Sequence, residues 1–158
     1  MNESKLDVKK RAVIEIAENL FLSQGLATTE MKEIARCASI SRSTLYRMFD
    51  SRETLAFAVA DKCLHELFDP KPMEIYGTDR SGFEILRSYS SNLIETMIQG
   101  VRYVKYLSEF DQMFSGDYPD TPEARKYVQF NRQRHDRQIL LNILRLGTED
   151  GSIRGDID

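Results

Sequence analysis

Hydrophobic positions recur every three or four residues along most of the chain, which is the spacing of one face of an α-helix. In residues 6–24, Val8, Ala12, Ile16 and Leu20 step by four, and Gly25 follows where the pattern stops. The same spacing predicts further helices over residues 28–38, 41–48, 51–68, 83–99, 101–114 and 121–146. No stretch has the alternating pattern of a β-strand, so we expect an all-α fold.

Small polar residues stand where several of these helices are expected to begin. Their side-chain oxygens can accept hydrogen bonds from the free N–H groups of a first helical turn. The candidate caps are Thr28 or Thr29, then Ser41, then Asp50 or Ser51. Asp50 and Glu53 also have the spacing of a capping box. Thr121, Pro122 and Glu123 place a cap, a first-turn proline and an acid in the order typical of a helix start.

Two of the predicted helices are short and separated only by Ser39 and Ile40. In the second of them, Leu45, Met48 and Phe49 can face inward. The side chains left facing outward are Arg42, Ser43, Thr44 and Arg47. Two short helices joined by a tight turn form a helix-turn-helix, whose second helix enters the major groove of DNA. Arg can donate two hydrogen bonds to guanine, and Ser or Thr can bind bases or phosphates.

A longer pattern surrounds these two helices. It consists of Ile34-Ala35, a Ser-x-x-Thr-Leu-Tyr segment over residues 41–46, Phe49, and a basic-Glu-x-Leu segment over residues 52–55, with Ala17 to Phe21 and Gly25 upstream. Over residues 8–60 this closely resembles the DNA-binding domain of the tetracycline-repressor (TetR) family of bacterial transcription regulators. Beyond residue 60 the resemblance is one of helical layout alone.

Three residues depart from the family pattern. Ser39 stands in the turn where the family usually has Gly, so a left-handed backbone there would cost roughly 1 kcal/mol. Ser43 also replaces a common Gly and adds a hydroxyl to the surface that would face DNA. Arg52 replaces the usual Lys and keeps a positive charge aimed at phosphate.

The resemblance implies a set of DNA contacts. Those expected to reach bases are Arg42, Ser43, Thr44 and Arg47, and those expected to hold phosphates are Thr28, Tyr46 and Arg52. Thr29 and Ser41 complete the predicted DNA-binding residues. Thr28 and Thr29 are either caps alone or caps that also touch DNA, and Tyr46 is expected both to pack its ring and to offer its hydroxyl to a phosphate.

The pattern also predicts two domains. Residues 1–50 would be the three-helix DNA-binding domain, and residues 51–158 a helical-bundle domain for ligand binding and dimerisation, with the helix 51–68 connecting the two. Eleven of the fifteen Phe and Tyr residues lie after residue 62. Most of them either pack a core or line an apolar ligand pocket. The pocket candidates are Arg87, Tyr89, Met97, Tyr103, Tyr106, Phe110, Phe114, Tyr127 and His135.

Charge is distributed unevenly along the chain. The formal net charge is −3, with +1 on residues 1–62 and −4 on residues 63–158. A near-neutral N-terminal part is compatible with DNA binding, because affinity depends on local phosphate contacts. Lys5, Lys9, Lys10 and Arg11 cluster at the start of the first helix, where cations oppose the helix dipole. Either a phosphate contact or a solvated basic end explains this cluster.

Other functional classes find little support in the sequence. No apolar run approaches the roughly 20 residues of a membrane span, and the polar first ten residues do not resemble a signal peptide, so we expect a cytoplasmic protein that does not bind membranes. Cys37 and Cys63 have no partner at metal spacing, and we expect reduced thiols, no metal and no cofactor. No nucleophile is paired with a base, which argues against an enzyme. The alternative function is a helical module that binds a ligand or a protein but not DNA.

The resemblance further implies a homodimer that binds an inverted repeat in double-stranded DNA, usually as a repressor, and releases it when a small hydrophobic effector binds. Members of the family usually carry two further helices after a segment such as 151–158, and dimerise through them. This chain lacks that pair of helices, so either the sequence is a shortened one or the dimer uses other helices. The candidate surface is then residues 122–146, with Tyr127, Ile139, Ile143 and Leu146 exposed.

Overall fold

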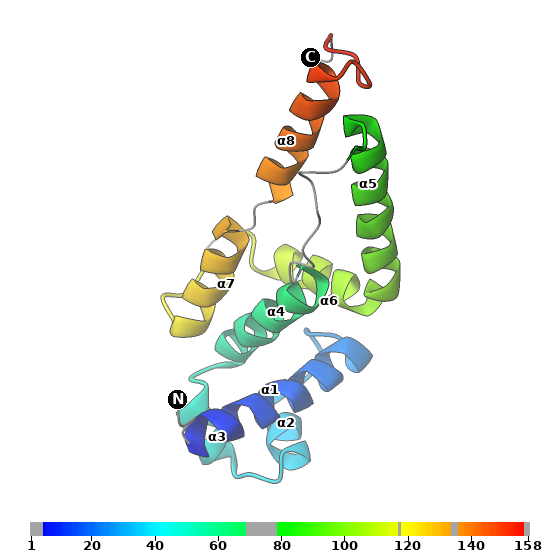
Figure 1. The fold of residues 1–158 in the computed structure, drawn as a ribbon. Helices are drawn as coiled ribbons and strands as arrows, with labels where there is room; N and C mark the ends of the chain where they lie inside the picture. The colour runs from blue at the N-terminus through cyan, green and yellow to red at the C-terminus, as the bar shows by residue number, and fades with distance from the viewer. Residues whose placement is uncertain (1–4, 69–78, 117, 134–135, 157–158) are drawn as a thin grey trace.

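The structure is a computed structural model that describes residues 5–68, 79–116, 118–133 and 136–156. These residues form eight α-helices and no strand, which confirms the all-α prediction for this part of the chain. The helices are α1 (Lys5–Gln24), α2 (Met31–Cys37), α3 (Arg42–Met48), α4 (Arg52–Phe68), α5 (Gly82–Gln99), α6 (Val101–Met113), α7 (Pro122–Gln133) and α8 (Asp136–Glu149). Figure 1 shows α1–α3 at one end of an elongated molecule and α5 and α8 at the other.

The first three helices pack around side chains that the helical spacing places on their inner faces. Ala17 and Phe21 of α1, Ile34 of α2 and Leu45 of α3 are all buried. Leu26, in the connection between α1 and α2, is also buried and so fixes that loop to the helices. The inward and outward faces predicted for α3 are therefore the ones observed.

Helix α4 is the centre of the molecule. It packs against α1, α6 and α7, and its middle section is buried on every side. Phe57 of α4 meets the rings of Phe110 and Phe114 on α6 and Tyr127 on α7, with centroid separations of 4.8, 5.1 and 5.7 Å. Burial also raises the pKa of the Cys63 thiol to about 12. Helix α4 thus contacts both an N-terminal helix and two of the helices that follow it.

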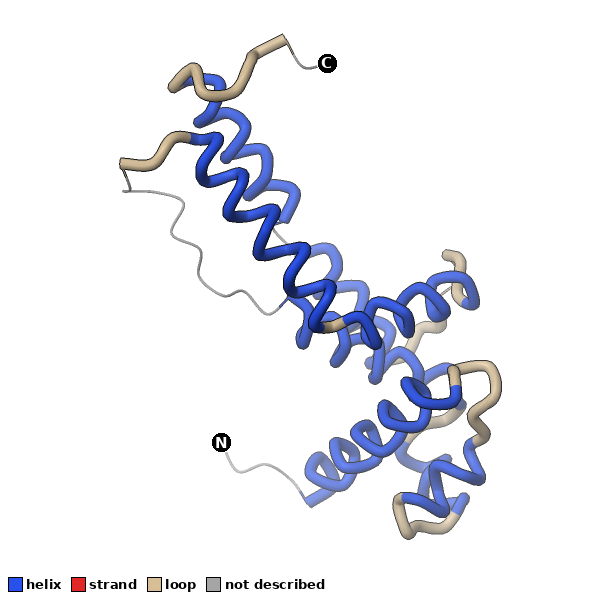
Figure 2. Tube along the Cα trace, turned by 90° about the vertical axis from the view of Figure 1, so that its right-hand side faces the viewer, coloured by secondary structure: helices blue, strands red, loops and turns tan. Residues whose placement is uncertain are grey.

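The buried core does not divide at residue 50. One continuous cluster of buried side chains includes residues of α1–α4, α6 and α7. A second, smaller cluster is centred on Ile85 of α5 and Ile143 of α8. Figure 2 shows α5 and α8 lying side by side and extending away from the other helices.

Specific residues determine both ends of α5: its start and the corner where it meets α6. Gly100 ends α5, and a Cβ there would lie 2.4 Å from Leu67 Cδ2, so a larger residue at this corner would require the Leu67 side chain to move. At its other end, α5 begins with a capping box between Ser81 and Glu84. The Gly82 N–H donates to Asp150 Oδ2 at 2.7 Å, so the segment after α8 also binds the start of α5.

The residues predicted to form one helix over 121–146 are described as α7 and α8, and residues 134–135 between them lie outside the described residues. Thr121 caps α7 as expected, accepting from the Ala124 N–H at 3.2 Å. However, α7 packs on α4, whereas α8 packs on α5. The apolar stripe stops at Phe130 and resumes at Ile139, and the polar run of residues 131–138 between them offers no continuous face to bury.

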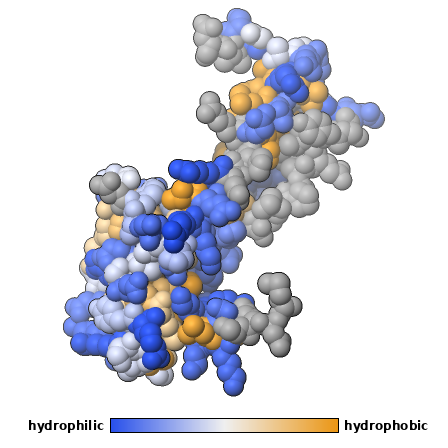
Figure 3. Space-filling view, turned by 90° about the vertical axis from the view of Figure 1, so that its left-hand side faces the viewer, coloured by the Kyte–Doolittle hydropathy of each residue, from blue (hydrophilic) through white to orange (hydrophobic). Residues whose placement is uncertain are grey.

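The four side chains predicted to form an exposed dimer surface are instead packed within the chain. Tyr127 and Ile143 are buried within the chain, and Ile139 and Leu146 pack against the α5–α8 cluster. Exposed apolar side chains are found instead on α8, at Leu140 and Leu141, and on α5, at Ile94, Ile98 and Phe83. Figure 3 shows hydrophobic atoms at the surface of the upper part of the molecule as well as the lower part. None of the described helices is both long and apolar enough to span a bilayer.

Candidate nucleic-acid interface

A tight turn joins α2 and α3, as in a helix-turn-helix. The N–H groups of Ser39 and Ile40 donate to the carbonyls of Arg36 and Ala35 at 3.1 and 3.0 Å, which closes the end of α2. Ser39 has a φ of 52°, in the left-handed region where the family usually has Gly. A non-glycine residue there costs roughly 1 kcal/mol, which the packing of α2 and α3 must offset.

The start of α3 is capped as predicted. Ser41 Oγ accepts from the Thr44 N–H at 3.1 Å. The Ser41 hydroxyl also lies 2.9 Å from Ser43 Oγ and 2.8 Å from Thr44 Oγ1. Three hydroxyls thus meet at the exposed first turn of α3, where each can donate to or accept from a further partner.

The outward face of α3 presents the side chains predicted to read bases. Arg42, Ser43 and Arg47 are exposed, whereas Thr44 is half-buried. Tyr46 keeps 47% of its surface exposed, so part of the residue is covered and part is accessible. On the opposite face, Leu45 is fully buried and fixes the orientation of the helix.

The two threonines before α2 do not cap it, which corrects the prediction. The N-cap residue is Glu30, and it makes no side-chain cap hydrogen bond. The Thr28 and Thr29 hydroxyls turn back toward α1, where they donate to the Gln24 carbonyl at 2.7 Å and the Gly25 carbonyl at 2.8 Å. Thr28 remains exposed, but Thr29 is fully buried and so does not lie on the surface that DNA would meet.

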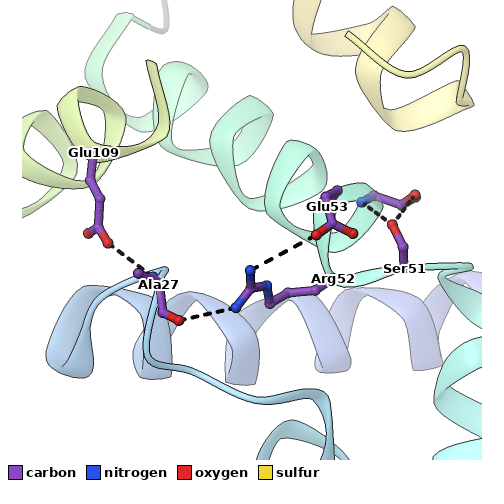
Figure 4. A network of polar contacts seen from close by, with 6 residues as sticks. Ala27, Ser51, Arg52, Glu53 and Glu109 are labelled. Carbon is purple, nitrogen blue, oxygen red and sulfur yellow. Dashed lines mark hydrogen bonds and ion pairs between the residues drawn. The ribbon is translucent and has the colours of Figure 1, made fainter. Parts of the chain in front are cut away.

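At the start of α4, Ser51 is the cap, because its Oγ accepts from the Thr54 N–H at 3.1 Å. The alternative of an Asp50–Glu53 capping box is not the one formed. Arg52, the predicted phosphate ligand, is half-buried and donates from Nη1 to the Ala27 carbonyl at 3.2 Å, with Glu53 at 4.0 Å (Figure 4). The guanidinium has further N–H groups that these contacts do not use.

The basic start of α1 is partly engaged within the molecule. Lys10 lies 3.7 Å from Glu123 of α7 and 5.3 Å from the centre of the Phe49 ring. Lys5 and Lys9 are exposed. Of the two interpretations of this cluster, Lys10 fits neither a phosphate contact nor a solvated end, because it links α1 to α7.

The residues predicted to bind a ligand do not form one pocket. Tyr106, Phe110 and Tyr127 are buried in the core, and Phe114 packs against it, as the core-packing interpretation expects. Tyr103 also packs on this core, Tyr89 belongs to the α5–α8 cluster, and Arg87 is exposed on α5. His135 lies outside the described residues.

Met97 does line an open groove of about 470 Å³ between the ends of α4 and α5 and one side of α6. Its other lining residues are Leu67, Phe68, Val104, Leu107, Ser108, Asp111 and Gln112. The lining is largely apolar, with a few polar groups on α6, which is the composition typical of small-molecule sites.

Sequence reasoning missed Glu109 on α6. Its carboxylate accepts from the Ala27 N–H at 3.1 Å, between positions 82 residues apart (Figure 4). Glu109 stands between Tyr106 and Phe110 on the face of α6 that turns toward α1 and α4. An acid on an otherwise apolar helical face was the signal that could have identified it.

Known proteins share both this motif and this fold. A family model described as bacterial regulatory proteins, tetR family, matches residues 13–59. The repressor KstR2 of Rhodococcus jostii (strain RHA1), named an HTH-type transcriptional repressor, is 29% identical over 154 residues, covering 95% of this chain and 70% of that protein.

Two further likenesses cover the helix-turn-helix and the whole fold. An uncharacterized HTH-type transcriptional regulator of Mycobacterium tuberculosis is 50% identical over 46 residues, covering 29% of this chain and 23% of that protein. The crystal structure of PfmR, a TetR family transcriptional regulator from Thermus thermophilus, superposes with a TM-score of 0.66 at 23% identity, covering 92% of this chain and 75% of that one. By its motif and sequence matches, the N-terminal part of the chain over residues 13–59 belongs to the TetR family of bacterial regulatory proteins, and the fold of the chain is shared with a solved regulator of that family.

Proposed function

We propose that this protein is a cytoplasmic transcriptional repressor that inserts α3 into the major groove of its operator. The observation that carries the proposal is the division of α3 into a buried face, held by Leu45, and an exposed face with Arg42 and Arg47. Arg42, Ser43, Thr44 and Arg47 would contact bases, because they lie on the exposed or half-buried side of a helix that fits the groove.

Phosphate contacts would come from residues that flank α3. Tyr46 is exposed on α3, and Thr28 is exposed in the loop before α2. Arg52 would reach a phosphate with the guanidinium N–H groups that do not bind Ala27. Contacts of this kind fix the register of the protein on the duplex but do not select its sequence.

The repressor would act as a homodimer on an inverted repeat. Two copies related by a two-fold axis would place their α3 helices in successive major grooves, about 34 Å apart along the duplex. The half-site spacing of the operator would then report the distance between the two α3 helices.

A small hydrophobic effector would release the DNA. The groove beside Met97 has a volume within the usual range of about 300–1,000 Å³ for ligand sites. An effector bound there would contact α4 and α6, which also contact the N-terminal helices. Release requires that the effector bind the DNA-free conformation more tightly than the DNA-bound one.

The test is selection from a random duplex library, with sequencing of the retained molecules. We expect an enriched inverted repeat, and binding that weakens steeply with salt as phosphate contacts are lost. A variant with Arg42 and Arg47 replaced by Ala should lose the enrichment.

The matched control replaces Arg145 and Arg154 by Ala. These two arginines are exposed at the α8 end of the molecule, so the control changes the net charge equally without touching α3. A folded protein that enriches no sequence, or a control that fails like the α3 variant, would reject the proposed function.

A further inference from the structure

The loop between α1 and α2 is held by a side chain from α6. Glu109 Oε1 accepts the Ala27 N–H at 3.1 Å. The same carboxylate lies over Gly25, where an added Cβ would be 3.5 Å from Oε1 and 3.7 Å from Oε2. Gly25 has a φ of 97°, and this left-handed turn lets the loop pass beneath Glu109.

The main chain of Ala27 is bound at both of its polar groups. While its N–H donates to Glu109 of α6, its carbonyl accepts from Arg52, the first residue of α4. The Thr28 and Thr29 hydroxyls brace the loop only against its own neighbours, Gln24 and Gly25. The contacts made by Glu109 and Arg52 therefore tie the loop to α6 and α4, two helices outside the helix-turn-helix.

Helix α6 is itself firmly seated on the N-terminal helices. Tyr106, one turn before Glu109, is buried, and its hydroxyl donates to the Ala56 carbonyl of α4 at 2.9 Å. The Tyr106 ring also stacks on Phe21 of α1, with centroids 6.0 Å apart and an interplanar angle of 12°. The Glu109 carboxylate is thus presented to the loop from a fixed support.

We propose that Glu109 is a positioning residue for DNA binding, which sets the place of α2, and through it α3, by holding the Ala27 main chain. The proposal rests on the repressor function proposed above. Helix α2 begins only four residues after Ala27 and lacks a side-chain cap of its own. Loss of the Glu109 contact would leave the start of α2 held by contacts within the N-terminal helices and by Arg52.

The direction in which loss of the Glu109 charge changes DNA affinity distinguishes a positioning role from a purely electrostatic one. Removing a negative charge from a protein that binds a polyanion strengthens binding if the charge acts only through the long-range field. A positioning role predicts the opposite, because a loosened α2 presents α3 to the groove less often in the competent orientation.

The experiment compares Glu109→Ala, Glu109→Gln and Glu95→Ala in the full chain. Glu95 is exposed on α5 and accepts from Gln99 Nε2 at 3.0 Å, so its substitution removes the same charge without touching the loop. Affinities would be measured by fluorescence anisotropy for the selected operator and for a scrambled duplex, and thermal unfolding would be recorded for each variant.

We expect Glu109→Ala to weaken operator binding about tenfold, equivalent to about 1.4 kcal/mol, with little change on the scrambled duplex. Glu109→Gln keeps an oxygen that can accept the Ala27 N–H, so it should remain within about threefold of the unaltered protein. Glu95→Ala should bind the operator as well as, or better than, the unaltered protein.

Three results would overturn the inference. These are unchanged or tighter operator binding by Glu109→Ala, an equal loss on both duplexes accompanied by a lower unfolding temperature, and a loss in Glu109→Gln as large as in Glu109→Ala. If the unaltered chain binds no duplex, the proposed function falls and this inference with it. Normal binding by both the unaltered chain and Glu109→Ala rejects the inference alone.

Discussion

Gly82 at the start of α5 and Gly147 near the end of α8 bring their backbones into direct contact. A Cβ added to Gly82 would lie 2.2 Å from the Gly147 Cα, and a Cβ on Gly147 would lie 2.4 Å from Ile153 Cδ1. Since the contact at Gly82 is with backbone, no side-chain rotation can make room. The pair of glycines therefore sets how closely α5 and α8 approach at this end.

We predict that Gly82→Ala destabilises the α5–α8 pair. Because the two backbones must separate, we expect a cost of about 1–3 kcal/mol, seen as faster amide exchange in α5 and α8. Ser91→Ala, at an exposed position of α5, is the control and should leave exchange unchanged. Equal exchange in the two variants would mean that the helices do not meet as described.

We predict that Tyr106→Phe lowers the free energy of unfolding by about 1 kcal/mol, the usual net value of one hydrogen bond. The substitution keeps the ring that stacks on Phe21 but leaves the Ala56 carbonyl without the hydroxyl donor. Urea unfolding measures the change. Tyr46→Phe removes the same atom from an exposed position and should leave stability unaffected, so similar losses in both would contradict the assignment.

We predict that Arg42→Ala weakens operator binding by about 1–3 kcal/mol and relaxes specificity, because a base contact is lost. Repeating the library selection with the variant would locate the position in the half-site that is no longer selected. Arg145→Ala changes the net charge equally at the far end of the molecule and serves as the control. An equal loss on specific and random duplexes would argue against base reading by Arg42.

The burial of Asp61 on α4 leads to a prediction about how stability depends on pH. Its Oδ1 is buried without a hydrogen-bond partner among the described residues, and His65 Nε2 lies 3.9 Å away. Burial raises the pKa of this carboxyl, against smaller lowering influences from His65 and Lys126. A raised pKa means that the folded state favours the protonated carboxyl, so stability is lost as the pH rises through the folded-state pKa.

We therefore expect Asp61→Asn to increase the free energy of unfolding near neutral pH, with a difference that shrinks as the pH falls and the carboxyl is protonated. Urea unfolding over a pH series measures this. Asp120→Asn is the control, because Asp120 is exposed in a surface ion pair with Arg125 and should show little effect. A stabilisation that is independent of pH would exclude the carboxylate charge as its cause.

The helices and the outward face of α3 could be predicted because both follow from local spacing. Ser41 and Thr121 were correct as caps for the same reason, since a cap depends on the residues that immediately follow it. Thr28 and Thr29 show the limit of this reasoning. Their hydroxyls had carbonyls of the α1 end within reach, and a sequence pattern does not reveal which of two local partners a side chain will take.

Long-range contacts were beyond the sequence alone. Aromatic residues such as Tyr106 and Tyr127 are compatible with a pocket or a core, and only the packing of α4, α6 and α7 decides between them. The bond between Glu109 and Ala27 depends on the placement of α6, which no local pattern gives. The change of packing partner within residues 121–146, from α4 to α5, had a local signal, the polar run of residues 131–138, which indicated a solvated face equally well.

The continuous core of α1–α4, α6 and α7 limits how the N-terminal and C-terminal parts of such regulators could be exchanged to make chimeras. A chimera joined at residue 50, with a foreign C-terminal part, would separate Phe21 from Tyr106 and the Ala27 loop from Glu109. Both halves would then present mismatched apolar surfaces to each other. Exchanging DNA specificity by grafting only the outward residues of α3, with the buried Leu45 and Met48 kept, leaves those surfaces intact, and is therefore the substitution that this architecture should tolerate.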